Sequence, residues 1–445
     1  MSRSDPDLPL PDAPAPPLPP EVFRRRRERL LEVLGDAVAI VPAAPELHRS
    51  RDTEVPYRPG SDIYYLTGYP EPQALAVIAG HQPERSFTLF VLPREPEREV
   101  WTGRRHGVDG ARELTGASAV HTVAEIEHRL FDLVAGASAI HYPIGLDDEL
   151  DRTVRDLVVR ARRGRARSGR GPTALYDLDE TLGPLRRVKD AEELERMRTA
   201  ARIAAAGHRA AIACVAPGVG EWEVQAELEA VFRRHGASGP AFPSIVGSGP
   251  NATTLHYTAN RRRIEEGDLV LIDAGAEWGM YCSDITRTVP ASGRLNGPQR
   301  DVYDVVLAAH HEAIEAVQVG SSVADVHEAA VRTLTRGMLD LGLLRDQSVD
   351  EAVERGSYRR FYMHQTSHWL GLDVHDVGLY QEGGVTVALV PGMVLTVEPG
   401  LYLASDDDTI PEAYRGIGVR IEDTVAITQE GVEILTSEVP TEVSA

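Results

Sequence analysis

The stretch that decides the fold of the second half of the chain is LVLIDAGAEWGMYCSDITRTV, residues 269–289. Its first seven residues are apolar except for Asp273, a pattern typical of a buried strand. A carboxylate in such a strand is costly unless it is paired, hydrogen-bonded or bound to a metal. Asp284 follows eleven residues later at the start of DITRTV, a separation that suits one hairpin. We therefore expect a β-hairpin that brings Asp273 and Asp284 together.

The same pattern recurs downstream. Glu398 interrupts the apolar run VLTVEPG, and Glu422 lies in GVRIEDTVAI, another β-rich run. Because side chains alternate along a strand, we expect Arg420 and Glu422 on the same side. A single glutamate beside an arginine is explained by a salt bridge, and a single aspartate by a cap or a turn. Four acids in four apolar strands are harder to explain in that way.

Three histidines, His364, His368 and His375, lie within the segment FYMHQTSHWLGLDVHDVG. One histidine in apolar surroundings is usually a core residue, but three so close together favour metal ligation or proton transfer. The first two are four residues apart, as in the zinc motif HExxH. Position 365 is a glutamine, which cannot act as the general base of such a site, so this motif is excluded.

Four carboxylates and one histidine form an oxygen-rich donor set. Such a set suits Mn²⁺, Co²⁺, Fe²⁺ or Mg²⁺ and is atypical of structural zinc. The carboxylates of Asp273, Asp284, Glu398 and Glu422 carry about four negative charges, which two divalent cations would balance. A single cation would leave about two buried charges uncompensated. The sequence therefore predicts a two-metal site with a shared hydroxide as the nucleophile.

Composition restricts the possible partners and the compartment. The 445 residues include 47 Lys and Arg against 68 Asp and Glu, and the formal net charge of −21 argues against nucleic-acid binding. The two cysteines, Cys214 and Cys282, cannot form a disulfide scaffold and fit a reducing cytosol. No stretch approaches 18 consecutive apolar residues, and the first twenty lack the apolar run of a secretory signal. We expect a cytoplasmic protein that binds neither nucleic acid nor a membrane.

The pattern along the chain predicts two domains. Eight prolines among residues 1–20 indicate a disordered or polyproline-like extension. Short apolar runs then alternate with helical segments, which indicates an α/β layer structure up to about residue 180. The stretch 162–173, rich in arginine, glycine and serine, is expected to be a linker or a solvated turn. We expect an N-terminal domain over 21–185 and a catalytic domain over 186–445.

Helical periodicity and strands alternate in the second domain, which indicates an α+β fold and is compatible with an internal duplication. The expected helices cover residues 190–214, 220–235, 297–317 and 322–342.

Several motifs together resemble the aminopeptidase P (Xaa-Pro aminopeptidase) branch of the pita-bread metallopeptidases. In the second domain they are IVGSGPNATTLHYTANR, the two aspartates, SHWLGLDVHDVG, TVEPGLY and GIGVRIED. In the first domain RDTEVPYRPGSDIYYLTGYPEP resembles the N-terminal domain of that branch, so the likeness extends from about residue 22. It implies a creatinase-like α/β domain followed by an α+β pita-bread domain with pseudo-two-fold symmetry.

The resemblance also implies roles for single residues. The five implied metal ligands are Asp273, Asp284, His368, Glu398 and Glu422. Asp284 and Glu422 would touch both ions, and Arg420 would orient a ligating carboxylate. Glu398 would pass a proton from the nucleophile to the leaving nitrogen.

Further implied positions concern the substrate. His256 and His375 match histidines that hold the substrate carbonyl and the tetrahedral intermediate, and His364 and Tyr402 match the lining of a proline pocket. Gln365 departs from the pattern, because relatives often have glycine there.

Two residues of the N-terminal domain also match substrate positions of the family. Asp52 and Trp101 match positions that approach the free amino terminus of the substrate. If they act across a subunit boundary, the enzyme is an oligomer, and ordinary packing is the alternative for Trp101.

The implied activity is release of the N-terminal residue from peptides with proline at the second position, by attack of a metal-bridging hydroxide. The implied cofactors are two divalent ions, for which we expect Mn²⁺, with Co²⁺, Fe²⁺ or Zn²⁺ as alternatives. The expected partners are such peptides and further copies of the chain in a dimer or tetramer. The alternatives are an Xaa-Pro dipeptidase and a catalytically silent pita-bread module that binds peptides.

Overall fold

The computed structural model describes residues 2–3 and 9–443, which form two compact units. One unit comprises Pro17–Leu185, and the other comprises Arg186–Ala445 together with Met1–Pro16. Within the described ranges, none of the helices combines the length and apolar character that a membrane span requires.

The N-terminal unit is built on a mixed six-stranded sheet with the strand order β7-β6-β5-β2-β8-β9. Its two central strands are almost entirely buried, as continuous apolar runs predict. The sheet strands are β2 (Val38–Pro42), β5 (Leu75–Ala79), β6 (Phe87–Val91), β7 (Ala119–Thr122), β8 (Ala139–His141) and β9 (Ala174–Tyr176). A separate two-stranded ribbon contains β3 (His48–Ser50) and β4 (Thr53–Glu54).

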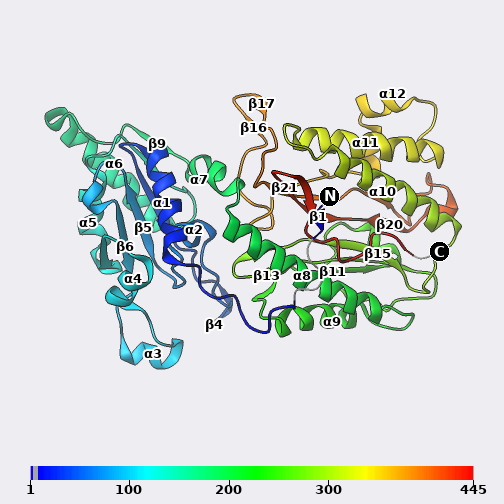
Figure 1. Cartoon of the computed structure of the whole chain (residues 1–445), viewed down its shortest axis with the longest axis horizontal. Coiled ribbons are helices and arrows are strands. Elements are labelled where there is room, and N and C mark those ends of the chain that lie inside the picture. Colours follow the sequence, from blue (N-terminus) through cyan, green and yellow to red (C-terminus); the bar gives the residue numbers. More distant parts are fainter. Residues whose placement is uncertain (1, 4–8, 444–445) are drawn as a thin grey trace. The chain divides into compact units, whose positions relative to one another are not determined.

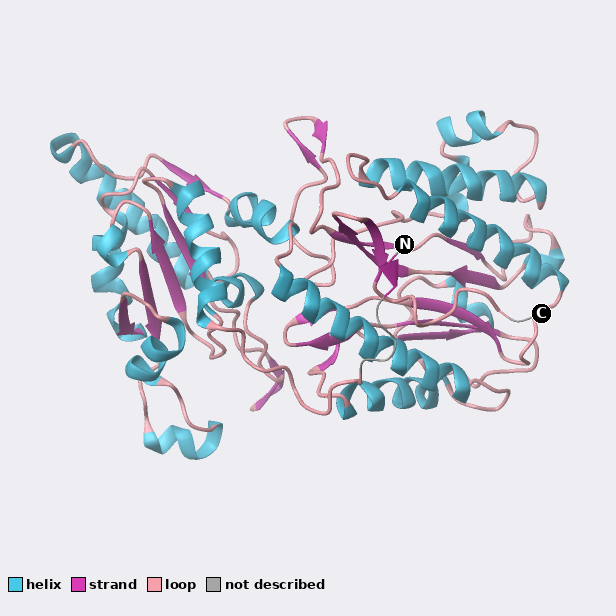
Figure 2. Cartoon of the chain, viewed as in Figure 1, coloured by secondary structure: helices cyan, strands magenta, loops and turns pink. Residues whose placement is uncertain are grey.

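Seven helices of the described chain belong to this region, and Figure 2 shows helices, in cyan, on both faces of the sheet. They are α1 (Pro20–Leu34), α2 (Ser61–Thr67), α3 (Pro96–Thr102), α4 (Gly107–Thr115), α5 (Ile126–Val134), α6 (Asp148–Ser168) and α7 (Leu178–Arg187). The α/β layer structure expected for this domain is confirmed.

Helix α6 corrects the expectation of a linker over 162–173, because the helix continues to Ser168. The Asp147 side chain caps its first turn, and Gly169 ends it in the left-handed conformation, with φ of 68°. Arginine is a good helix former, so the charged stretch extends the helix without contributing to a core. Only the last few residues of the expected linker are non-helical.

The proline-rich segment 1–20 lies partly outside the described residues. Residues 9–16 form a strap without helix or strand that belongs to the second unit, which corrects the expectation of disorder there. His235 donates to the carbonyl of Pro11 over 2.8 Å, and the indole N–H of Trp278 donates to that of Ala13 over 3.4 Å. Proline lacks an N–H but keeps its carbonyl, so an extended proline-rich chain still presents acceptors to a neighbouring surface.

In the second unit, the expected long helices lie where their periodicity and caps predict. Asp190, Asn296 and Ser322 each form a capping box at the start of a helix. The helices are α8 (Ala191–Cys214), α9 (Glu221–Arg234), α10 (Gly297–Ala316), α11 (Val323–Asp340) and α12 (Val349–Glu354).

The strands of this unit lie between two helix pairs, with α8 and α9 on one side and α10 and α11 on the other (Figure 1). The first half contributes β10 (Gly239–Pro240), β11 (Ile245–Ser248), β12 (Leu269–Asp273), β13 (Ala276–Trp278), β14 (Tyr281–Cys282) and β15 (Thr286–Pro290). The second half contributes β16 (Gln381–Glu382), β17 (Val385–Thr386), β18 (Val394–Val397), β19 (Gly400–Leu403), β20 (Ile417–Arg420), β21 (Asp423–Thr428) and β22 (Gly431–Ile434).

Each half of the unit begins with two long helices and ends with antiparallel strands, and the second half also contains the short α12. In the first half β12 lies between β11 and β15, and in the second half β21 lies between β18 and β22, which also pairs with β1 (Ser2–Arg3). Both helix pairs cover the same layer of strands. This arrangement is the expected pita-bread fold.

The strand assignment of the four acids is wrong for three of them. Asp273 is the last residue of β12, but Asp284 precedes β15, Glu398 follows β18, and Glu422 lies between β20 and β21. At Glu422 the chain changes partner, because its backbone N–H donates to the Thr286 carbonyl in an isolated bridge. Acids at strand ends are released from the ladders and can point into the space between the two halves.

Candidate metal centre and active site

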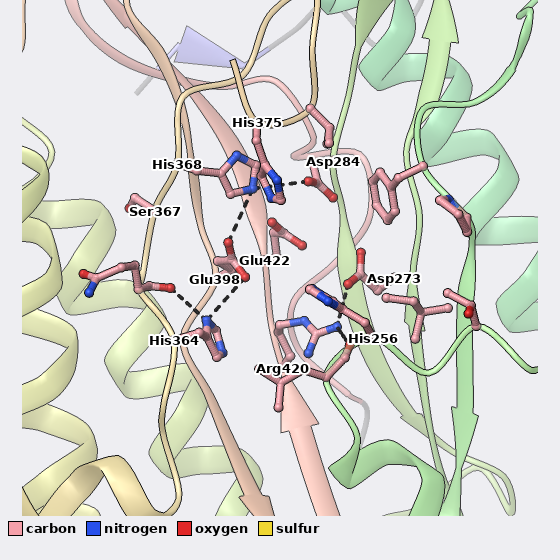
Figure 3. A pocket seen from close by; sticks show the side chains of 17 residues that line it. His256, Asp273, Asp284, His364, Ser367, His368, His375, Glu398, Arg420 and Glu422 are labelled. Carbon is pink, nitrogen blue, oxygen red and sulfur yellow. Dashed lines mark hydrogen bonds and ion pairs between the residues drawn. The ribbon is translucent and has the colours of Figure 1, made fainter. Parts of the chain in front are cut away.

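The three closest potential ligands are Asp284, His368 and Glu422, whose donor atoms lie within 4.8 Å of one another. The imidazole Nε2 of His368 is 3.5 Å from an oxygen of Asp284 and 3.5 Å from an oxygen of Glu398. Figure 3 shows these side chains and Asp273 pointing toward one another from both halves of the unit. The five ligands implied by the resemblance therefore share one site.

The burial, the unsatisfied oxygens and the raised pKa values of the acids fit a bound cation. Asp273, Asp284 and Glu422 are buried. One carboxylate oxygen each of Asp273 and Asp284 has no hydrogen-bond partner among the residues that the structure describes. Burial raises the pKa of Asp284 to about 6 and that of Glu398 to about 7, and it raises the pKa of Glu422 well above its usual value. Divalent cations would supply the missing partners and the compensating charge.

His368 is held in the tautomer that a metal ligand needs. Its Nδ1–H donates to the carbonyl of Trp369 over 3.1 Å, so Nε2 faces the acids. Burial lowers the pKa of this imidazole, but the hydrogen bond with Asp284 and the charge of Glu398 outweigh burial and raise it to about 9. Without a cation, His368 is therefore protonated and serves as the counter-charge of the acids.

Arg420, the last residue of β20, is buried and connects three side chains. Its guanidinium donates to Asp273 over 2.5 Å, to the Tyr402 hydroxyl over 2.8 Å and to the Thr286 hydroxyl over 3.2 Å. Tyr402 in turn can donate to Nε2 of His364, 2.8 Å away. Arg420 thus contacts one candidate ligand directly and reaches His364, which lines the cavity, through the Tyr402 hydroxyl.

His364 is neutral in this arrangement. Its Nδ1 lies 2.8 Å from the carbonyl of Gln365, to which it donates when Nε2 accepts from Tyr402. Burial, and then the charge of Arg420, lower the pKa of His364 to about 3. The glutamine that departs from the family pattern contributes only its carbonyl to this contact.

These side chains open into one cavity of about 520 Å³. Its polar lining comprises His256, Thr258, Asp273, Asp284, His364, Gln365, Ser367, His368, His375, Glu398, Arg420 and Glu422. Its apolar lining comprises Phe242, Pro243, Ile245, Leu255 and Val374. A mixed lining of this kind suits a ligand with an apolar side chain and a polar backbone.

His375 and His256 reach the cavity from separate loops. The His375 ring is perpendicular to that of His368, with 4.5 Å between centroids, and burial together with the charge of His368 lowers its pKa. His256 lies in an exposed turn after the short 3₁₀ segment Gly249–Thr253. Both are available to a bound molecule.

The cavity lining does not include Asp52 or Trp101, which belong to the N-terminal unit. Asp52 lies in the exposed turn between β3 and β4. Trp101 lies on α3 and is 88% exposed, so the alternative of ordinary packing for Trp101 within the described chain is wrong.

Sequence reasoning missed Thr286. Its hydroxyl donates to a carboxylate oxygen of Glu422 over 2.6 Å and accepts from Nε of Arg420. The signal was available, because Thr286 follows Asp284 by two residues in DITRT. A threonine so close to a candidate ligand is well placed to orient a neighbouring ligand.

Comparisons with known proteins agree with this geometry. Residues 195–429 match the model of metallopeptidase family M24, and residues 23–141 match the aminopeptidase P N-terminal domain. The chain is 40% identical over 428 residues to the Xaa-Pro aminopeptidase of Escherichia coli (strain K12), with 95% of this chain and 96% of that protein covered. It is 37% identical over 428 residues to the Xaa-Pro aminopeptidase of Haemophilus influenzae, with 96% of each covered.

Solved structures of aminopeptidase P are also similar to this chain. The structure of Pseudomonas aeruginosa aminopeptidase PepP matches with a TM-score of 0.90 and 43% identity over 96% of each chain. Zinc-substituted E. coli aminopeptidase P in complex with product matches with a TM-score of 0.90 and 40% identity, over 96% of this chain and 97% of that one. With two family models, two domains and a cluster of candidate metal ligands among the described residues in agreement, the chain belongs to metallopeptidase family M24.

Proposed function

We propose that this protein is an Xaa-Pro aminopeptidase, which hydrolyses the peptide bond before a proline at the second position. The observation that carries the proposal is the convergence of Asp284, His368 and Glu422 in one cavity. The same cavity is lined by three histidines outside the implied ligand set, His256, His364 and His375. The E. coli and H. influenzae relatives, matched over nearly their whole length, bear the name Xaa-Pro aminopeptidase.

A bond to proline demands unusual recognition, because its nitrogen carries no hydrogen. A protease that binds the N–H of the bond it cleaves has nothing to hold there. The cavity offers the ring a wall made by His364. Tyr402, expected to line the same pocket, is buried behind that wall and supports it by the hydrogen bond between its hydroxyl and His364. We assign the proline ring to this wall.

We propose that the site holds two divalent ions, with Mn²⁺ as the expected metal and Co²⁺, Fe²⁺ or Zn²⁺ as alternatives. The residues that would hold them are Asp273, Asp284, His368, Glu398 and Glu422. Divalent ions in such a site lower the pKa of a bound water and polarise the carbonyl of the substrate.

Glu398 is the residue that we assign to proton transfer. The hydroxyl of Thr396 donates to its Oε1 over 3.3 Å, and its Oε2 lies 3.6 Å from Nδ1 of His364. From there the carboxylate can accept the proton of the attacking water and deliver it to the proline nitrogen that leaves. His256 and His375 donate to the carbonyl oxygen as negative charge develops on it.

Asp52 and Trp101 remain candidates for binding the free amino terminus of the substrate. A site completed by another subunit would make the enzyme a dimer or tetramer. Dilution to the monomer would then lower activity without unfolding the chain, and sedimentation combined with activity measurements would test this.

The central experiment is turnover of a peptide Xaa-Pro-Xaa before and after chelation. We expect release of the first residue, loss of activity with the chelator, and recovery with Mn²⁺. A matched peptide with alanine in place of proline tests the role of the ring. Cleavage of the dipeptide Xaa-Pro alone would indicate a dipeptidase instead, and tight binding of the peptide without cleavage would indicate a silent binding module.

A further inference from the structure

Glu221, the first residue of α9, is completely buried and accepts five hydrogen bonds. Its Oε1 accepts from the backbone N–H of Ser248 over 2.8 Å, from the hydroxyl of Ser248 over 2.7 Å and from the amide of Asn251 over 3.0 Å. Its Oε2 accepts from the Tyr257 hydroxyl over 2.9 Å and from the backbone N–H of Arg262 over 2.8 Å. None of these donors is a cationic side chain.

The five donors all belong to one segment, residues 248–262, which starts at the end of β11 and lies within its connection to β12. One oxygen holds the beginning of the segment at Ser248, and the other holds its end at Arg262. Between them lies His256, which lines the cavity together with its neighbours Leu255 and Thr258. Glu221 itself does not line the cavity.

His256 depends on its backbone for its position. Its side chain is exposed and makes no hydrogen bond with any residue that the structure describes. The adjacent Tyr257 is bonded to Glu221, and the preceding Leu255 carbonyl accepts from Arg420 over 3.4 Å. The imidazole is thus held at the cavity by one attachment on either side of it, the carbonyl of Leu255 and the side chain of Tyr257.

We infer that Glu221 is a positioning residue, whose carboxylate holds segment 248–262 so that His256 meets the substrate carbonyl. The inference rests on the proposed function, because that function makes His256 a hydrogen-bond donor to the reacting group. An acidic residue in the first turn of a helix is also favoured by the helix dipole, and that explanation predicts an effect on stability alone.

Only a carboxylate satisfies this arrangement. Each oxygen of Glu221 faces a backbone N–H, at Ser248 or at Arg262, and a backbone N–H cannot reverse its polarity. Glutamine has the same shape, but in either orientation its NH₂ group opposes one of these two donors. The change Glu221→Gln therefore releases one end of the segment while preserving volume.

The first test compares the kinetics of Glu221→Gln and the wild type, both loaded with Mn²⁺, on an Xaa-Pro-Xaa peptide. We expect kcat to fall about 10- to 100-fold, because misplacement of a reacting group by about 1 Å has an effect of that size. In the His256→Ala background the same change should lower kcat less than about 3-fold further, since the donor that it positions is already absent.

Glu433 provides a matched control. It is a buried carboxylate of the same unit that pairs with the Arg198 guanidinium through two contacts of 2.8 Å. Glu433→Gln also removes a charge from a buried site, but its side-chain partner, Arg198, lies outside segment 248–262. We expect it to lower the thermal stability and to leave kcat within about 2-fold of the wild type.

Hydrogen exchange supplies a measurement that does not depend on activity. In metal-free protein, the amides of Ser248 and Arg262 should exchange faster in Glu221→Gln than in the wild type, and should be unchanged in Glu433→Gln. If Glu221→Gln does not fold, Tyr257→Phe removes one of the five bonds and keeps both backbone contacts. That variant should lose about 3- to 10-fold in kcat, a loss that again disappears in the His256→Ala background.

The outcomes separate this inference from the proposed function. The positioning role is overturned if Glu221→Gln has the kcat of the wild type. It is also overturned if Glu221→Gln lowers kcat by the same factor in the His256→Ala background as in the wild type. A wild-type enzyme that cleaves no Xaa-Pro-Xaa peptide overturns the proposed function, and the exchange rates still decide whether Glu221 holds the segment.

Discussion

The guanidinium of Arg420 lies against the carboxylate of Asp273, with 2.5 Å between Nη2 and Oδ2. Two further contacts of the same fork hold Tyr402 and Thr286. One side chain therefore aligns a candidate ligand, the tyrosine that supports His364 and a partner of Glu422. A lysine carries one compact ammonium group and cannot make these three contacts in a fixed plane.

For Arg420→Lys we expect metal affinity to fall about 10- to 100-fold, the usual effect of removing a residue that orients a ligand. Titration of the metal-free protein with Mn²⁺ measures this. Arg198→Lys, which changes the pair with Glu433 in the same unit, serves as the control and should bind the metal normally. Unchanged affinity in Arg420→Lys would show that Asp273 does not need the arginine.

Removal of the metal should lower the thermal stability of the second unit. Among the residues that the structure describes, the cationic contacts of these acids are then His368 and Arg420. Bound cations stabilise the folded state in proportion to the logarithm of their concentration. A melting curve with chelator, and with increasing Mn²⁺, measures the effect. In Asp284→Asn the dependence on Mn²⁺ should be much weaker, and an undiminished dependence would argue against Asp284 as a ligand.

His375→Ala should lower kcat about 10²- to 10³-fold while the fold is preserved, because one donor to a developing oxyanion contributes about 2.7 to 4 kcal/mol. Steady-state kinetics on an Xaa-Pro-Xaa peptide and a melting curve measure the two effects. His311→Ala, at an exposed position on α10, is the control. Turnover near the wild-type rate in His375→Ala would refute its role.

His208 should make the stability of the metal-free protein sensitive to acid. It is fully buried, its Nε2–H donates to the Ala274 carbonyl over 3.0 Å, and burial lowers its pKa to about 4. In the unfolded chain the His208 imidazole is protonated below about pH 6.5, whereas in the folded chain it is protonated only near pH 4. Between these pH values His208 therefore binds more protons in the unfolded state than in the folded state. The free energy of unfolding therefore decreases as the pH falls from about 6.5 to about 4.

In His208→Gln this part of the pH dependence should disappear, so the decrease over that window should be smaller by about 2 kcal/mol. Urea unfolding of both proteins without metal, at several pH values, measures it, and the contribution of the acids cancels in the comparison. Identical pH profiles for the two proteins would contradict the prediction.

Local signals explain what the sequence could predict. The helix expected over 190–214 is observed as Ala191–Cys214, because an aspartate cap and an apolar period are both encoded within the helix itself. The convergence of the acids with His368 was expected from their unusual apolar surroundings. The roles of these residues as ligands remain predictions.

The features that were missed depend on residues far apart in the sequence. Glu422 leaves its strand because the chain changes partner to Thr286, which lies in the other half of the unit. From the local sequence Glu221 is only an acidic residue at the start of a helix. Its five hydrogen-bond donors can be identified only when the path of segment 248–262 is known. Periodicity and capping carry no information on such contacts.

The isolated bridge between Thr286 and Glu422 has a consequence for assembly. Asp273 and Asp284 come from the first half of the duplicated unit, whereas His368, Glu398 and Glu422 come from the second. Two separately expressed fragments, cut before α10, would each carry an incomplete chelate and would regain full cation affinity only on reassociation. Metal uptake would thus report directly on fragment complementation.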